Sequence, residues 1–135
     1  MTAPPFRKGT LLILSGPVEH LHVVMNDPIF FPEQNYDAVL SVNISSIRNG
    51  IYHDPACELQ AGCHPFVRHP SYAAYKHATV MSSVRVSTEV AAGGIRTHAV
   101  VSDEVFDRIM AGFYATQHLT PKVRRFLNNY VGRAE

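Results

Sequence analysis

Short apolar runs, each bounded by glycine, proline or asparagine, predict that most of this chain folds into strands. The clearest run is at residues 38–46, where one face would carry Ala38, Leu40, Val42 and Ile44. The other predicted strands are residues 10–14, 21–25, 79–86 and 97–101. The first three strands follow one another too closely for a crossover helix, which favours antiparallel pairing.

Two stretches between these strands are expected to be irregular. Pro32 and the adjacent phenylalanines before it indicate a packed loop at residues 29–37. Gly93 and Gly94 indicate a hairpin turn within residues 89–96.

Helical patterns are concentrated at the end of the chain. Ser102 is suited to cap a helix with an acidic first turn, and apolar positions repeat at helical spacing over residues 105–113. Thr120 followed by Pro121 predicts the start of a second helix, and Gly132 its C-terminal cap. We therefore expect an α+β fold, a small curved antiparallel sheet or barrel with two C-terminal helices on one side.

The composition fits one globular domain over residues 1–135, with the sheet at about 9–101 and the helical part at about 102–132. Hydrophobic residues make up 46% and charged residues 17%, so the chain is not disordered. The formal net charge of +1 gives no global attraction for a polyanion. Contact with nucleic acid would need a local patch, either the segment around Arg68 or the cations Lys122, Arg124, Arg125 and Arg133.

The two cysteines, Cys57 and Cys63, and the polar start of the sequence indicate a cytoplasmic protein with reduced thiols. No apolar run approaches the length needed to cross a bilayer, so no membrane association is expected.

Side chains capable of chemistry are concentrated in residues 57–78. The segment holds the imidazoles, cations and phenols of His64, Arg68, His69, Tyr72, Tyr75, Lys76 and His77. Such a set can move protons and hold an anion, and loops on a rigid scaffold often carry function. The alternative is that these residues are ordinary amphipathic packing in a loop.

General acid–base work on a phosphodiester fits these residue types. Cleaving RNA through its own 2′-hydroxyl requires a base, an acid for the leaving 5′-oxygen, and a cation near phosphorus. His64 and His69 would supply the base and the acid, in either order, with Arg68 as the cation. Tyr72 and Tyr75 would bond the phosphate or stack on a base, and Lys76 would help to hold the anion. No metal or cofactor enters this hypothesis.

A second group of polar residues lies on the predicted strands. His20 and His22 are two residues apart and would share one face of their strand. If that strand pairs with residues 38–46, they would meet Ser41, Asn43 and Ser45 in a polar wall that binds a phosphate or a ribose. Ser46, the next residue along the chain, is a further candidate for substrate binding. The alternative is an ordinary solvated sheet face.

Two other chemistries are open. Cys57, Cys63, His64 and His69 are four zinc-ligand types, although their spacing departs from that of structural zinc sites. Cys63 beside His64 would be a nucleophile and its base, although adjacent residues rarely meet in the required geometry.

The order of these elements resembles the PemK/MazF family of toxin endoribonucleases, which are small SH3-like barrels with helices. Residues 9–14 resemble the family's first strand, and residues 20–25 its second. Residues 42–46, reading Val-Asn-Ile-Ser-Ser, resemble its Pro-Ile-Thr-Ser segment, and residues 75–86 its later strand. The likeness covers most of residues 9–115.

The resemblance implies a cytoplasmic homodimer that cleaves single-stranded RNA without a metal and binds a cognate antitoxin. The chain departs from the family pattern in that Glu19 and His20 stand where the family has an arginine, and Ser45 replaces a threonine. The alternatives are a non-catalytic SH3-like binding module for a protein or a nucleic acid, and a zinc-stabilised regulatory domain.

Overall fold

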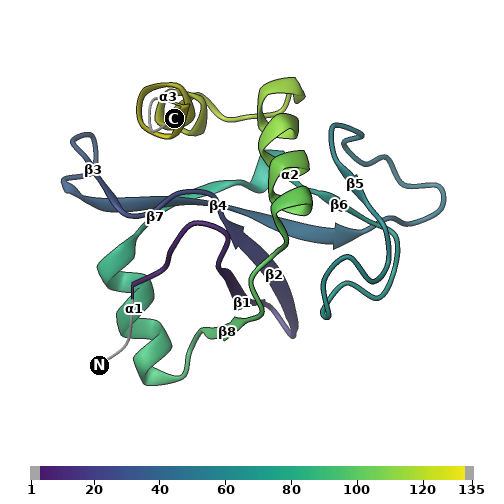
Figure 1. Cartoon of the computed structure of the whole chain (residues 1–135), viewed down its shortest axis with the longest axis horizontal. Helices are drawn as coiled ribbons and strands as arrows, with labels where there is room; N and C mark the ends of the chain where they lie inside the picture. The colour runs from purple at the N-terminus through teal and green to yellow at the C-terminus, as the bar shows by residue number, and fades with distance from the viewer. Residues whose placement is uncertain (1–3, 133–135) are drawn as a thin grey trace.

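An antiparallel sheet forms the frame of the protein in the computed structural model, which describes residues 4–132 (Figure 1). Its strands are β1 (Thr10–Ser15), β2 (Val18–Val24), β3 (Ile29–Phe31), β4 (Tyr36–Ser46), β5 (Glu58–Leu59), β6 (Ser71–Ala73), β7 (Thr79–Ser82) and β8 (Arg96–His98). The order is β5-β6-β4-β2-β1-β8, with β3 and β7 also paired to β4. The predicted α+β class and antiparallel pairing are confirmed.

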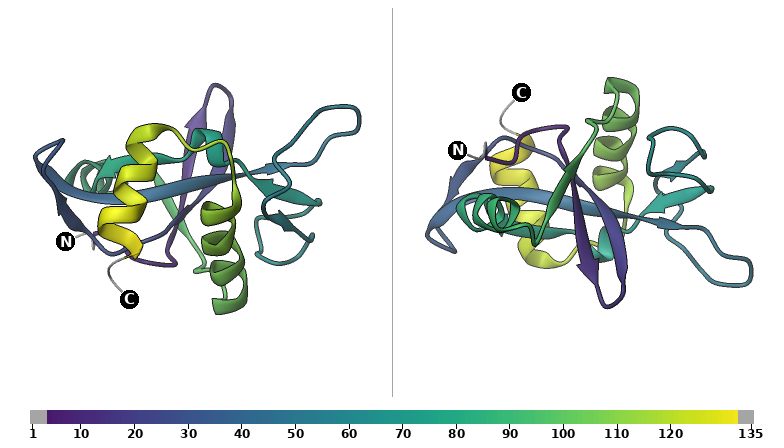
Figure 2. Two further views of the ribbon diagram at one scale, coloured as in Figure 1. Left: turned by 90° about the horizontal axis from the view of Figure 1, so that it is seen from above. Right: turned by 90° about the horizontal axis from the view of Figure 1, so that it is seen from below.

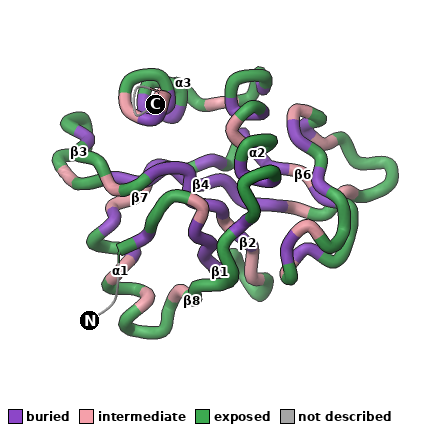
Figure 3. The backbone as a smooth tube through the Cα atoms, in the orientation of Figure 1, coloured by how far each residue is buried: buried purple, intermediate pink, exposed green. Residues whose placement is uncertain are grey.

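Strand β4 is the centre of the sheet. Its first half pairs with β3 and β7, and its second half with β2 and β6. Residues 38–44 are buried without a break, so neither face of the strand is solvated there (Figure 3). The expected pattern of one buried and one polar face is therefore wrong for β4.

Helices cover both faces of this sheet (Figures 1 and 2). They are α1 (Ser83–Ala92), α2 (Asp103–Ala115) and α3 (Pro121–Phe126), which continues into a π-helical turn, Leu127–Val131; a short 3₁₀ turn, Tyr75–His77, precedes β7. Within residues 4–132 no helix has both the length and the apolar character that a bilayer crossing requires.

The two C-terminal helices begin as the sequence predicted. The Ser102 hydroxyl accepts from the Val105 N–H at 3.2 Å, and the Thr120 hydroxyl accepts from the Val123 N–H at 3.4 Å. Gly132 does not adopt the left-handed conformation expected of a glycine cap, because its φ is −64°.

The apolar residues form two clusters, one on each side of the sheet. The larger cluster lies under α2 and α3 and includes Leu40, Phe106 and Phe126. The smaller cluster, Leu11, Val24, Val39 and Val86, lies on the other face, where α1 covers β4 and β7.

Residues 79–96 differ most from prediction. The valine-rich run was expected to be one strand over residues 79–86, but β7 ends at Ser82, whose hydroxyl accepts from the Arg85 N–H and starts α1. Val86 and Val90 then lie four residues apart, on one side of the helix, against the second cluster. Gly93 ends α1 with φ +86° instead of forming a hairpin turn.

Two smaller corrections concern residues 29–37 and 97–101. Ile29–Phe31 is a strand and not a loop, joined to β4 by a turn in which Asn35 has φ +56°. The last strand is limited to Arg96–His98, and all three residues are exposed at the sheet edge.

Helix α2 approaches the sheet closely at Gly112. A Cβ atom built there would overlap the Tyr75 hydroxyl and lie 2.7 Å from Cζ of the same ring. That hydroxyl donates to the Ile109 carbonyl at 2.8 Å, and the ring meets Phe113 edge-on at 4.8 Å. Only glycine therefore allows this helix to pack on Tyr75.

We predict that Gly112→Ala lowers the free energy of unfolding by about 1–3 kcal/mol, because the added methyl group overpacks the core. The higher helix propensity of alanine, worth about 1 kcal/mol, only partly offsets this cost. Urea denaturation measures the change, and adding Tyr75→Phe should recover part of it by removing the hydroxyl. A Gly112→Ala protein as stable as the wild type would contradict this packing.

Candidate functional site

Three adjoining hollows at the end of β4 form what we call the histidine groove. The central hollow, of about 380 Å³, is lined by His20, Ser45, Ser46, Arg48, His53 and Tyr72 among others. The Arg68 hollow, of about 450 Å³, contains Arg68, His69 and His98. The Tyr52 hollow, of about 160 Å³, contains Tyr52, Lys76 and His118.

These hollows adjoin one another, because they share wall residues. Ile44, Ser46 and Phe66 line both the central and the Arg68 hollow, and Tyr52, His53 and Tyr72 line both the central and the Tyr52 hollow. Five of the eight histidines in the sequence line the groove. It is therefore rich in groups that exchange protons near neutral pH.

Strand pairing determines which residues come together in the central hollow. Leu21 pairs with Ile44, so His20 and Ser45 adjoin at the same end of β2 and β4. Tyr72 pairs with Ser45 from the other side, on β6. The structure therefore brings together four residues that the sequence singled out: His20, Ser45, Ser46 and Tyr72.

His53 occupies the centre of the groove and was not predicted from the sequence. Its Nε2 lies 2.6 Å from the Glu58 carboxylate, and its ring lies 5.1 Å from that of Tyr72. A carboxylate bonded to one ring nitrogen fixes the orientation of an imidazole and compensates the charge when the ring gains a proton. The only sequence signal is the run Tyr52-His53-Asp54 in the loop after β4.

The loop after β4, residues 47–57, extends beyond the sheet (Figure 2) and supplies Arg48, Tyr52 and His53 to the groove. It is tied down at Asp54, whose Oδ1 accepts from the Ala56 N–H and whose Oδ2 accepts from the Thr116 hydroxyl at 2.6 Å. Because Thr116 directly follows α2, the helix helps to position the wall of the groove.

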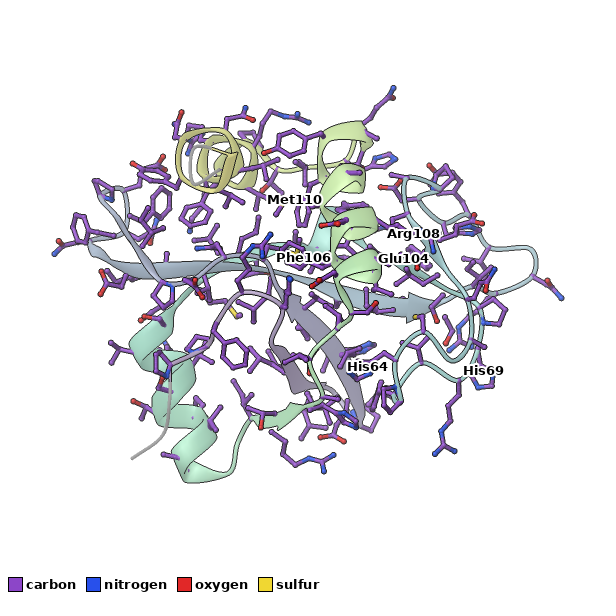
Figure 4. The ribbon with its side chains drawn as sticks, viewed as in Figure 1. His64, His69, Glu104, Phe106, Arg108 and Met110 are labelled. Atoms are coloured by element: carbon purple, nitrogen blue, oxygen red, sulfur yellow. The ribbon has the colours of Figure 1, made fainter. Side chains whose placement is uncertain are left out.

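The sequence suggested that His64 moves protons on a substrate, but its side chain is buried. It is 3% exposed and lies on the inner side of its loop, while His69 is exposed at the outer edge (Figure 4). Its Nε2 donates to the Ala99 carbonyl at 2.6 Å, and its Nδ1 accepts from the Phe66 N–H at 3.0 Å. Burial lowers the pKa of His64, and His98 acts in the same direction, so the ring is neutral and both nitrogens are occupied. This geometry gives His64 a structural role.

Tyr75 is also outside the accessible part of the groove. It is 1% exposed, and its ring forms the floor of the Tyr52 hollow with its hydroxyl turned to the Ile109 carbonyl. Burial raises the pKa of this phenol far above its usual range, with Cys57 adding to the shift, so it cannot serve as an acid–base group near neutral pH.

His22 lies on the strand face away from the larger core, paired with Asn43. It lines none of the three hollows. Burial, with a smaller effect of His20, lowers the pKa of His22 to about 4. Its Nδ1 and the Asn43 Oδ1 are buried without a hydrogen-bond partner among the described residues. The polar wall expected on this face thus contributes His20 and Ser45 to the groove, but not His22.

The cysteine hypotheses find no support in the arrangement of side chains. Burial raises the pKa of both the Cys57 and the Cys63 thiol, which disfavours the thiolate that a nucleophile needs. Between residues 4 and 132 no three His, Cys, Asp or Glu side chains are grouped to hold a metal ion. In the basic group near the end, Arg125 is paired with Glu33, and Arg133 lies outside the described residues.

A further hollow, of about 290 Å³, lies between the N-terminal segment, α1 and β8. Its walls are mostly apolar, with Phe6, Leu11 and Val90 among them, and His98 is the only imidazole that the described residues place there. It lacks the paired acid–base groups of the histidine groove.

The fold is similar to that of a chain in a crystal structure of MazE–MazF from Deinococcus radiodurans, with a TM-score of 0.55. The match covers 87% of this chain and 99% of that one, at 10% sequence identity. No protein-family model and no curated protein matches the sequence. The chain therefore has a MazF-like fold, as its resemblance to the PemK/MazF family implied.

We predict that His64→Ala destabilises the fold, whereas His69→Ala leaves its stability nearly unchanged. His64→Ala should lower the free energy of unfolding by about 2 kcal/mol, because it removes two hydrogen bonds from a buried position. His69→Ala should change it by less than about 0.5 kcal/mol, as for most exposed positions. Urea denaturation measures both changes in the free energy of unfolding. Equal effects of the two substitutions would contradict the structural role of His64.

Proposed function

We propose that this protein is a toxin-like endoribonuclease that cleaves single-stranded RNA by metal-independent general acid–base catalysis in the central hollow. The main support is His53, which is bonded to Glu58 at 2.6 Å and lines the same hollow as His20 and Arg48. An oriented imidazole, a second imidazole and a cation are the groups that transesterification by the 2′-hydroxyl requires.

In this proposal His53 takes the proton from the 2′-hydroxyl, and the 2′-oxygen attacks phosphorus. The bond from phosphorus to the 5′-oxygen breaks, and His20 donates a proton to that oxygen. The products are a 2′,3′-cyclic phosphate and a free 5′-hydroxyl. Glu58 offsets the charge of the imidazolium that forms on His53, and Arg48 stabilises the charge that develops on the phosphate.

Other residues that the sequence singled out would contact the phosphate and the nucleotide. Ser45 and Ser46 donate hydrogen bonds to phosphate oxygens, and Tyr72 stacks on or bonds the nucleotide at the reaction centre. Arg68 and His69, in the adjoining hollow, bind a neighbouring phosphate. The proton transfers first expected of His64 and His69 thus pass to His53 and His20.

Partners follow from the same proposal. The similar crystal structure is that of MazE–MazF, and we propose a cognate antitoxin for this chain in the same way. We also propose that the chain acts in the cytoplasm, as a homodimer.

We predict that expression of the wild type in bacteria arrests growth and fragments cellular RNA. His53→Gln and His20→Gln should each lower the cleavage rate by about 10²–10⁴-fold, the usual contribution of a positioned acid or base. His77→Gln, an exposed imidazole outside the groove, is the matched control and should cleave as the wild type does.

The purified protein should cleave an RNA oligonucleotide in the presence of EDTA and leave a 2′,3′-cyclic phosphate. An oligonucleotide with 2′-deoxyribose at the scissile position should stay intact. A folded wild-type protein that leaves RNA whole would refute the nuclease and favour the non-catalytic binding module.

A further inference from the structure

Tyr52 is an exposed aromatic side chain that is nevertheless held in one position. It is 73% exposed, yet its hydroxyl lies 3.2 Å from the His118 Nε2 and the two rings meet edge-on. Asp54, two residues later, is fixed through the Thr116 hydroxyl. The ordering of this ring is thus achieved in the free protein, which lowers the entropic cost of stacking a ligand on it.

The hollow beside Tyr52 has aromatic walls and a cation at its rim. Tyr52, His53 and Tyr72 contribute rings, and Lys76 is exposed at the edge. The polar groups of the floor are already bonded, since Asp54 accepts two hydrogen bonds and the Tyr75 hydroxyl donates to Ile109. The π faces and the Lys76 ammonium group suit a planar base next to a phosphate.

The charges along the groove favour a polyanion as its occupant. Arg48, Arg68 and Lys76 are cations distributed over the three hollows. Of the two carboxylates that line it, Glu19 is paired with Arg96, and Asp54 accepts hydrogen bonds from neutral donors, so the three cations outnumber the one carboxylate without a cation partner. Because the three hollows adjoin one another, an extended strand that lies along the groove would meet all three.

We propose that the Tyr52 hollow binds one nucleobase of a single-stranded RNA, stacked on Tyr52, with the adjacent phosphate at Lys76. The proposal rests on the proposed function for the identity of the strand, because the base lies beside the nucleotide that is cleaved in the central hollow. It requires binding only, and does not depend on catalysis. Stacking makes this hollow tolerant of sequence, since every base has a π face.

The test is binding of fluorescein-labelled 2′-O-methyl RNA 10-mers, which lack the 2′-hydroxyl needed for cleavage. Homopolymers of adenosine and uridine serve as probes, and fluorescence anisotropy gives Kd. Tyr52→Ala should weaken binding about 5- to 150-fold, the loss of one stacked base. Tyr52→Phe should stay within about threefold, because the ring remains. Phe30→Ala removes an exposed ring from β3, at the other end of β4, and should bind as the wild type does.

An abasic scan identifies the stacked base. Moving a single abasic site along the tighter oligonucleotide should reveal one position where the loss equals that of Tyr52→Ala. At that position the two changes together should cost no more than either alone, because both remove the same contact. Additive losses at every position, or a Tyr52→Ala protein with wild-type affinity, would overturn the proposal.

Failure of this proposal and failure of the nuclease are distinguishable. Tyr52-dependent binding without cleavage of ordinary RNA would leave the stacking site and refute the enzyme. Cleavage by the wild type, together with a Tyr52→Ala protein that keeps the wild-type Kd, would refute the stacking site alone. Failure of the wild type to bind any of these RNAs, as expected if the groove binds a peptide, would overturn the stacking site.

Discussion

The pairing of β4 with four neighbouring strands is the constraint on which the rest of this structure depends. Its 11 residues are hydrogen-bonded to β3 and β7 in the first half and to β2 and β6 in the second. Helices cover both of its faces, so the strand is fixed by hydrogen bonds on its two sides and by apolar contacts above and below. A strand held in this way can fix the positions of its last side chains and of the loop that follows it.

The histidine groove is attached to that end. His20 comes from β2 and Tyr72 from β6, the two neighbours of the second half of β4, while Ser45 and Ser46 are its last residues. The loop that follows adds Arg48, Tyr52 and His53 and is anchored to Thr116 after α2. Rigid strands therefore supply one wall, and a tethered loop supplies the other. This arrangement combines precise placement with room for an extended ligand.

Local patterns predicted β1, β2 and β4 and the N-terminal caps of the two C-terminal helices, because these depend on neighbours in the sequence. The run at residues 79–86 was misassigned because alternating valines suit either a strand or a helix that covers an apolar face, and tertiary packing made the choice. The density of chemical groups singled out Arg68, His69 and Tyr72, which line the groove, together with His64 and Tyr75, which are buried, because sequence alone does not separate exposed from buried side chains. The roles of His64 and Tyr75 depend on Ala99 and Ile109, each more than 30 positions away. His53 was not predicted because its hydrogen bond to Glu58 forms only when the loop folds.

The most direct test of this account is to map RNA contacts by NMR. A non-cleavable single-stranded RNA would be titrated into the labelled protein, and backbone amide shifts followed. The account predicts that the largest changes fall in the second half of β4, in β6 and in residues 47–57. Changes concentrated on α1 and the N-terminal segment, around the apolar hollow, would contradict it and assign binding to that hollow instead of the groove.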